Sequence, residues 1–143
     1  MSKYRVIEVE FQSEAALVQA LEDFVGKFGG AYEHHEQPTH LVGYQGDTRP
    51  EKAEYIIRRR YLSSGANDIG FARQADGTFR AIVSDFDAGN GNYSDREESA
   101  KFAFIKQRYA YHQTLAAAEA QGYTAYEEEL EDGSIVLTLE RGW

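Results

Sequence analysis

The chain has 143 residues, the length of one ordinary domain, and its 42% of apolar residues are enough to form a core. Its formal net charge of −9 opposes binding to nucleic-acid phosphates and to anionic membranes. It contains no cysteine, which excludes disulfides, thiol nucleophiles and cysteine-ligated metal centres built from this chain alone. We therefore expect a single globular domain over residues 1–143, with no nucleic-acid or membrane partner and no cofactor.

The first residues, "MSKYRVIEVEF", enter a strand-like pattern directly. They lack the basic start and long apolar run of a signal peptide. No apolar run in the chain approaches the length of a bilayer-spanning helix. These features predict a soluble protein in the cytoplasm.

Residues 4–11, "YRVIEVEF", alternate apolar and charged side chains, which is typical of a half-buried strand. Ser13 is suited to cap a helix that follows, and Leu17, Leu21 and Phe24 recur on one face of it. The glycine pair 29–30 predicts the end of this helix, because glycine adopts left-handed backbone angles without a steric penalty.

Two strands are predicted next, around Leu41–Tyr44 and Glu54–Tyr61, with Pro38, Gly46 and Pro50 as the breaks. A hairpin follows that turns at Asp76-Gly77. The glycine- and asparagine-rich segment after it is expected to be a loop.

A long helix is predicted from about Asp95 to Gln121, with Ser94 and Glu97 as a capping box and Gly122 as its end. A second hairpin turns near residues 132–133, with Ile135, Leu137 and Leu139 on one face of its return strand.

This order predicts an α+β fold of two layers, an antiparallel sheet with both helices on one face. A ferredoxin-like arrangement with extra strands is the first candidate topology.

The long helix carries an unusual row of polar residues, which we call the polar seam: Lys101, Arg108, His112 and Glu119. Their spacings of seven, four and seven residues align them on a helix between two apolar flanks, where a structural helix would place leucine. Tyr109 and Tyr111 lie on those flanks.

The polar seam has two interpretations. In the structural one, the stems of Arg108 and His112 are packed, Arg108 pairs with a carboxylate of the sheet, Asp68 or Asp85 being the best candidates, and His112 hydrogen-bonds a carbonyl. In the functional one, Arg108 binds an anion, Tyr111 donates a hydrogen bond and His112 moves protons or accepts a ligand.

Two other motifs are weaker. In "EHHEQPTH", residues 33–40, three histidines lie near two glutamates, but their spacing matches no known metal site, and we predict no metal there. "RRR", Arg58–Arg60, lies in a predicted strand, where a solvated basic stripe is one interpretation and an anion-binding sheet face is the other.

Four segments, "LVGYQGDTR", "NDIGF", "IKQRYAYH" and "EEELEDGSIVLTLER", occur in an order and spacing similar to those of a known family. Through them the chain resembles the uncharacterised chloroplast hypothetical reading frame 35-like family (domain of unknown function 1257), which has counterparts in cyanobacteria, other bacteria and phages. The resemblance brings no catalytic residues. It implies a partner, an ATPase or another small protein, and it directs attention to Gly43, Tyr44, Arg49, Asp68, Gly70, Phe71, Arg108, Tyr109, Tyr111 and His112.

No catalytic motif is present, so the leading hypothesis is a small binding or adaptor domain that acts through a partner protein. The alternative is a small enzyme or anionic-ligand-binding protein that uses Arg108 and His112 of the polar seam, with Asp68 or Asp85 as the supporting carboxylate. An enzyme needs a pocket where these groups converge, whereas an adaptor needs an exposed apolar patch.

Overall fold

The computed structural model describes residues 4–63, 65–84 and 97–141. Its elements in chain order are β1 (Tyr4–Phe11), α1 (Glu14–Phe28), β2 (Glu33–Val42), β3 (Thr48–Ile57), a short 3₁₀ helix η1 (Arg59–Tyr61), β4 (Ile69–Arg73), β5 (Phe79–Ser84), α3 (Glu97–Ala120), β6 (Tyr123–Glu129) and β7 (Ile135–Arg141). The expected loop of residues 85–94, the helix start at Asp95 and the Ser94–Glu97 capping box fall outside this description.

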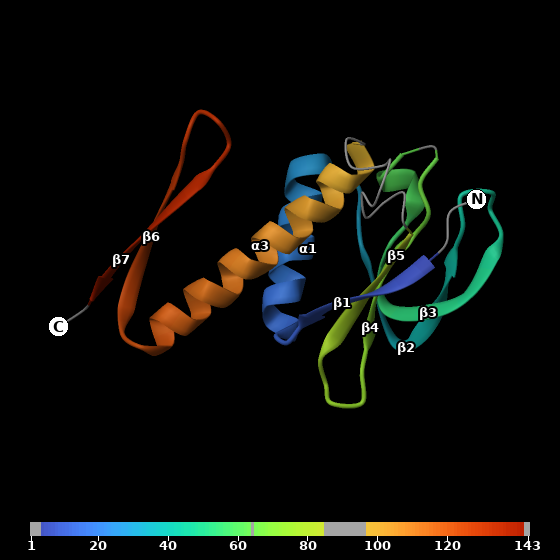
Figure 1. Cartoon of the computed structure of the whole chain (residues 1–143), viewed down its shortest axis with the longest axis horizontal. Helices are drawn as coiled ribbons and strands as arrows, with labels where there is room; N and C mark the ends of the chain where they lie inside the picture. Colours follow the sequence, from blue (N-terminus) through green and yellow to red (C-terminus); the bar gives the residue numbers. More distant parts are fainter. Residues whose placement is uncertain (1–3, 64, 85–96, 142–143) are drawn as a thin grey trace.

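Five strands form one antiparallel sheet in the order β1-β5-β4-β3-β2, and β6 and β7 form a second, two-stranded sheet. Helices α1 and α3 lie side by side on one face of the larger sheet, while the β6–β7 hairpin stands beyond the helices (Figure 1). The predicted α+β class, with an antiparallel sheet and both helices on one face, is confirmed. None of the helices in the described part of the chain is long and apolar enough to cross a membrane.

The ferredoxin-like arrangement is present only in part. Because every neighbouring pair in the larger sheet is antiparallel, β1 and β2 run in the same direction at its two edges, joined by α1. This is a split β-α-β unit with three strands between its members. In the described residues after α3, β6 and β7 pair with each other and do not join this sheet.

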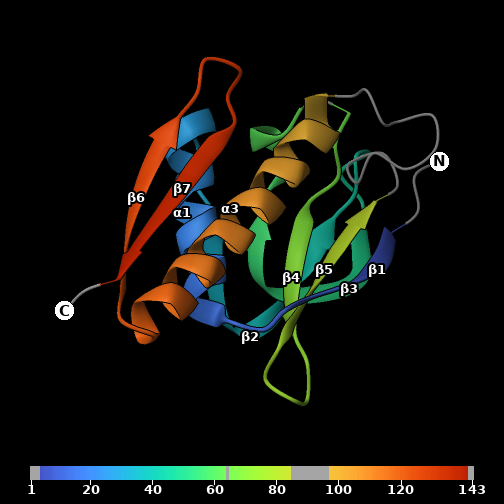
Figure 2. The ribbon, with the colours of Figure 1, turned by 60° about the vertical axis from the view of Figure 1, so that its left-hand side comes forward.

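The main core lies between the larger sheet and the helices. Its buried side chains come from one face of each helix and from the facing side of the strands, and include Leu17, Leu21, Phe24, Phe102, Ile105, Phe11, Phe71 and Phe79. Full burial of such a side chain stabilises the fold by roughly 1.5–3 kcal/mol. Burial of these side chains therefore holds the helices on this face (Figure 2).

Helix α1 begins and ends where the sequence predicts. The Ser13 side chain accepts a hydrogen bond from the Ala16 N–H at 3.1 Å, and Gly29 follows the helix with a φ of 79°. The Ser13 N–H also donates to the Tyr109 hydroxyl at 3.0 Å, which joins the start of α1 to α3. The predicted hairpin turns at Gly77 and Gly133 are also present, each with a positive φ.

The bounds predicted for the second and third strands are wrong. β2 and β3 are each ten residues long and contain Pro38 and Pro50, which were expected to be breaks. Pro38 lies in an edge strand, and the β2–β3 register shifts between His34 and Thr39 and again after His40. Proline is tolerated at edges and bulges, because no ladder hydrogen bond from its nitrogen is required there.

A smaller apolar cluster covers the other face of the larger sheet. Ile56 and Ile82 both lie opposite Gly70 in the strand register, so they share the face that points away from the helices. Leu41 and Ala53 complete this cluster. A Cβ added at Gly70 would lie 2.7 Å from the Ala53 Cβ and 2.9 Å from a Leu41 methyl group, so the curled β2–β3 hairpin requires glycine at this position.

We expect Gly70→Ala to lower the free energy of unfolding by about 1–3 kcal/mol, because the added methyl group overpacks a rigid contact. Gly26→Ala is the matched control. It lies inside α1 with no atom within 4 Å of the added Cβ, so that change should stabilise the protein by about 0.5–1 kcal/mol. Urea unfolding of both variants measures the two effects, and equal stability of Gly70→Ala and the parent would contradict the packing argument.

Candidate functional site

Two members of the polar seam share one carboxylate on the neighbouring helix. The Arg108 Nε donates to Asp23 Oδ2 at 2.7 Å, and the His112 Nε2 lies 2.6 Å from the same oxygen. Asp23 is on α1, so the seam fastens α3 to α1. Both side chains on α3 are largely buried, with exposed fractions of 14% for Arg108 and 16% for His112.

The seam also fastens the β6–β7 hairpin to α3. Arg108 Nη1 lies 3.4 Å from Glu127 Oε1, and the Tyr111 hydroxyl donates to Glu127 Oε2 at 2.6 Å. The Arg108 guanidinium also stacks over the Tyr111 ring at 4.3 Å. Arg108 is thus the centre of a three-way contact between α1, α3 and β6.

These contacts shift the titration of the groups that make them. Partial burial alone would raise the pKa of Asp23, but hydrogen bonds from Arg108 and His112 lower that pKa below its ordinary value. The hydrogen bond to Glu127 raises the pKa of the Tyr111 hydroxyl. Asp23 is therefore held as a carboxylate in the folded protein.

Of the two sheet carboxylates predicted for Arg108, Asp68 is the wrong partner, and the pairing with Asp85 stays a prediction. Asp68 does not face the seam, and Asp85 lies outside the described residues. Arg108 instead pairs with Asp23 on α1 and with Glu127 on β6, because it lies at the edge where α3 meets α1 rather than over the larger sheet.

The other candidates on α3 separate from Arg108 and His112. The Lys101 ammonium donates to the Leu62 carbonyl at 2.7 Å, near the start of α3 and away from Arg108. Tyr109 is a core residue that packs edge-on against Phe11 at 4.8 Å. Glu119 is exposed. Among the candidates on α3, Arg108, Tyr111 and His112 therefore lie together, whereas Lys101, Tyr109 and Glu119 lie apart from them.

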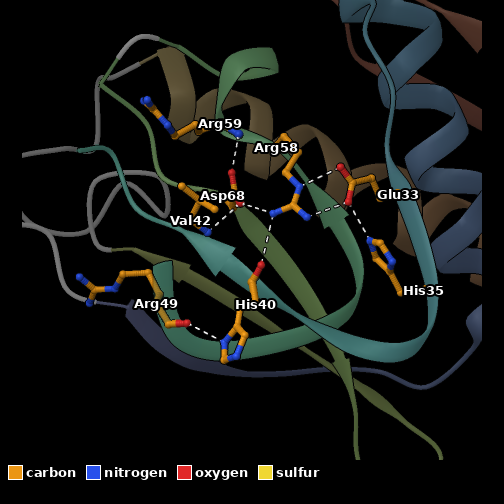
Figure 3. Close-up of polar contacts among 8 residues, drawn as sticks. All are labelled: Glu33, His35, His40, Val42, Arg49, Arg58, Arg59 and Asp68. Atoms are coloured by element: carbon orange, nitrogen blue, oxygen red, sulfur yellow. Dashed lines mark hydrogen bonds and ion pairs between the residues drawn. The ribbon is translucent and has the colours of Figure 1, made fainter. Parts of the chain in front are cut away.

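Asp68 belongs to a second polar network, at the junction of β2, β3 and β4 (Figure 3). Only 1% of the residue is exposed. Its Oδ1 accepts the Arg59 N–H at 2.7 Å, and its Oδ2 accepts the Val42 N–H and the Arg58 Nη1, each at 2.8 Å. Its own N–H donates to the Val42 carbonyl at 3.0 Å.

Arg58 joins Asp68 to a second carboxylate on the edge strand. Its Nε and Nη2 donate to the two oxygens of Glu33 at 2.8 and 2.9 Å, a bidentate pair. The hydrogen bonds from Arg58 lower the pKa of Glu33, and His35 Nε2 lies 2.7 Å from the same carboxylate. One guanidinium is thus held between two carboxylates.

Sequence reasoning placed the three arginines 58–60 in a strand, but β3 ends at Ile57 and η1 begins at Arg59. Arg58 and Arg60 therefore do not share a strand face. The sequence signal for this network is Asp68, an acidic residue among the apolar residues of "ANDIGF". A carboxylate buried there needs a cationic or N–H partner, such as a nearby arginine.

The histidines of residues 33–40 are directed to different neighbours. The His34 ring stacks on Tyr55 at 4.4 Å, and His40 Nδ1 lies 2.9 Å from the Arg49 carbonyl. In the described part of the chain, no three histidine, aspartate or glutamate side chains are grouped so that they could hold a metal ion.

Several apolar side chains of the β6–β7 hairpin are exposed. Tyr126 is 54% exposed, and Val136, Leu130 and Leu139 are each 42% exposed. Alternation places Tyr126 and Val136 on the face that points away from α3, since Glu127 on the opposite face contacts Arg108 and Tyr111.

We expect Asp23→Asn to lower the free energy of unfolding at pH 7 by about 1.5–3 kcal/mol, because hydrogen bonds to a charged acceptor are lost. The pKa of Asp23 is lowered on folding, so its contribution is complete above the ordinary value near 4 and is lost as pH falls below that value. The gap between parent and variant should therefore close in acid.

Urea unfolding from pH 7 to pH 2.5 measures this gap. Glu119→Gln is the control, an exposed acid of the same seam, and it should change stability by no more than about 0.5 kcal/mol. A gap for Asp23→Asn that is the same at both ends of the pH range would show that ion pairing is not its source.

Comparison with known proteins agrees with the resemblance at the level of a family. The model of a family described as "Protein of unknown function (DUF1257)" matches residues 27–138, well over half of the chain. No curated protein and no solved structure matches the chain. The matched range includes α3, the Asp68 network and most of the β6–β7 hairpin, whereas Asp23 lies before it. The chain belongs to the DUF1257 family of proteins of unknown function.

Proposed function

We propose that the protein is a binding or adaptor domain that acts through a protein partner, and that the β6–β7 hairpin is its docking surface. The observation that carries this proposal is the separation of the hairpin from the five-stranded sheet. A two-stranded sheet by itself is at best marginally stable in water. This one is held mainly by one face against α3, which leaves its other face for a partner.

The exposed face offers apolar contacts of the kind that anchor interfaces. Tyr126 projects from β6 opposite Thr138, and Val136 projects from the same face of β7 opposite Glu128. Tyrosine is enriched at binding hot spots because it combines a large apolar ring with a polar tip. Clustered exposed side chains of this type typically mark an interaction site.

The hairpin is also strongly acidic, which sets the chemistry of the partner. Arg141 is its single basic residue. Its acidic residues are Glu127, Glu128, Glu129, Glu131, Asp132 and Glu140. Glu127 is used by Arg108 and Tyr111, and the others are exposed. A partner with an apolar patch surrounded by lysine or arginine would match this surface.

The strand edges supply a second mode of contact. Within the described residues, β6 and β7 pair only with each other, so each presents an outer edge with unpaired N–H and C=O groups. An extended segment of the partner can add to such an edge through main-chain hydrogen bonds. An ATPase or another small protein, the partner types that the family resemblance implies, is the first to test.

We expect the double change Tyr126→Ser and Val136→Ser to abolish partner capture from the native cell, because the exposed anchors are removed. The melting temperature should change by only a few degrees, since neither side chain is in the core. Affinity capture with mass spectrometry identifies the partner, and titration of the purified partner measures its dissociation constant with each variant.

The charge of the surface is tested separately. Glu128→Lys should weaken binding to a basic partner, whereas the charge-matched control Glu36→Lys, on the distant strand β2, should not. Sedimentation of the purified protein tests whether the hairpin binds a second copy instead. Self-association lost in the Tyr126→Ser, Val136→Ser variant, or a partner retained by that variant, would contradict the proposal.

A further inference from the structure

A hollow of about 870 Å³ opens beside the Asp68 network, and no residue of the β6–β7 hairpin lines it. It is lined by Arg58–Arg60 and by the carboxylates of Glu33 and Asp68, together with His40, Val42, Thr48 and Ser63. Its volume lies within the range of about 300–1,000 Å³ that small-molecule sites occupy. None of the α3 residues of the polar seam contributes to it.

The charged groups in the floor of this hollow are already paired with one another. Arg58 directs its donors to Glu33, Asp68 and the His40 carbonyl, so its single positive charge is shared by two carboxylates. Asp68 in turn also accepts two backbone N–H groups, from Val42 and Arg59. These contacts fix the backbone from which the neighbouring arginines project.

Arg59 and Arg60 are different, because neither guanidinium group is directly paired within the described part of the chain. Neither guanidinium forms a hydrogen bond or an ion pair with any described residue. Arg60 lies over the Tyr61 ring at 4.8 Å, a contact that orients the guanidinium and leaves its N–H donors available.

Ser63 adds a third donor group to the same hollow. Its Oγ is buried from solvent and has no hydrogen-bond partner among the described residues. Leaving a buried hydroxyl unpaired is unfavourable, and such groups call for an explanation such as a missing ligand. The lining of the hollow thus combines two unpaired cations with one unsatisfied hydroxyl.

From this arrangement we infer that the hollow binds a phosphate-bearing small molecule through Arg59, Arg60 and Ser63. A phosphate monoester carries about −1.5 to −2 charges at neutral pH and can pair with both free guanidinium groups. The planar donor fork of arginine matches the geometry of phosphate oxygens, and three terminal oxygens can accept from all three side chains. A single carboxylate offers one negative charge and two oxygens and would leave a donor or a charge unmatched.

The volume of the hollow exceeds what a phosphate group fills, so the phosphate is expected to carry an organic body. Val42 and the methyl group of Thr48 supply apolar surface for that body. The site is separate from the hairpin: its residues come from β2, β3, η1 and the segment around them, whereas the hairpin contacts α3. This inference therefore stands independently of the proposed partner.

Isothermal titration of the purified full chain with inorganic phosphate, pyrophosphate and adenosine monophosphate tests it, at constant ionic strength with sodium chloride as the balance. We expect saturable binding of adenosine monophosphate or pyrophosphate. Arg59→Gln should weaken that binding by about tenfold or more, because charge-assisted hydrogen bonds are lost. Arg141→Gln, which removes one positive charge from the hairpin, should leave the affinity unchanged.

Ser63→Ala separates a binding role from a structural one. Because its hydroxyl has no described partner, the change should not lower the melting temperature, yet it should weaken binding several-fold. Absence of saturable binding of all three probes at millimolar concentration, or equal affinity of Arg59→Gln and the parent, would overturn the inference. Arg59-dependent binding only to vesicles containing phosphatidic acid would also overturn it, since the phosphate would then belong to a lipid headgroup.

Discussion

The buried carboxylate of Asp68 is the constraint on which the sheet depends. It lies just before β4, accepts the N–H of Val42 at the end of β2 and the N–H of Arg59 after β3, and pairs with Arg58. Removal of one partner from a buried charge pair typically costs about 3–5 kcal/mol, because the remaining charge is left uncompensated. One side chain thereby sets the positions of three strand ends, and it also fixes the backbone that carries Arg59 and Arg60.

A second carboxylate, Asp23, has the same role between the helices and the hairpin. Arg108 reaches Asp23 on α1 and Glu127 on β6, so the hairpin is attached to the domain through a polar contact at its inner face. The contacts of Arg108, Tyr111 and His112 favour the structural interpretation of the polar seam, because each polar tip already has a carboxylate partner. Side chains that can contact another molecule lie elsewhere, on the outer face of the hairpin and in the hollow beside Asp68.

These two open regions differ in sign and in chemistry. The hairpin is acidic and apolar and suits a basic protein surface, whereas the hollow carries unpaired guanidinium groups and suits a small anion. The overall charge of −9 is the sum of such regions. It predicts poor binding to extended polyanions, but it does not describe a local site within a concave surface, where low-dielectric walls concentrate the local field.

By itself, the sequence determined the features that depend on neighbouring residues. The α+β class, α1 with Ser13 at its start, and the turns at Gly77 and Gly133 all follow from periodicity, capping and glycine conformation. The tertiary structure decided which distant side chains meet. Helical spacing aligned Arg108 with His112 but could not show that both face Asp23, 85 residues away from Arg108 in the chain. It likewise could not show that the hairpin leaves the sheet or that Asp68 meets Arg58, because such contacts depend on how whole elements pack.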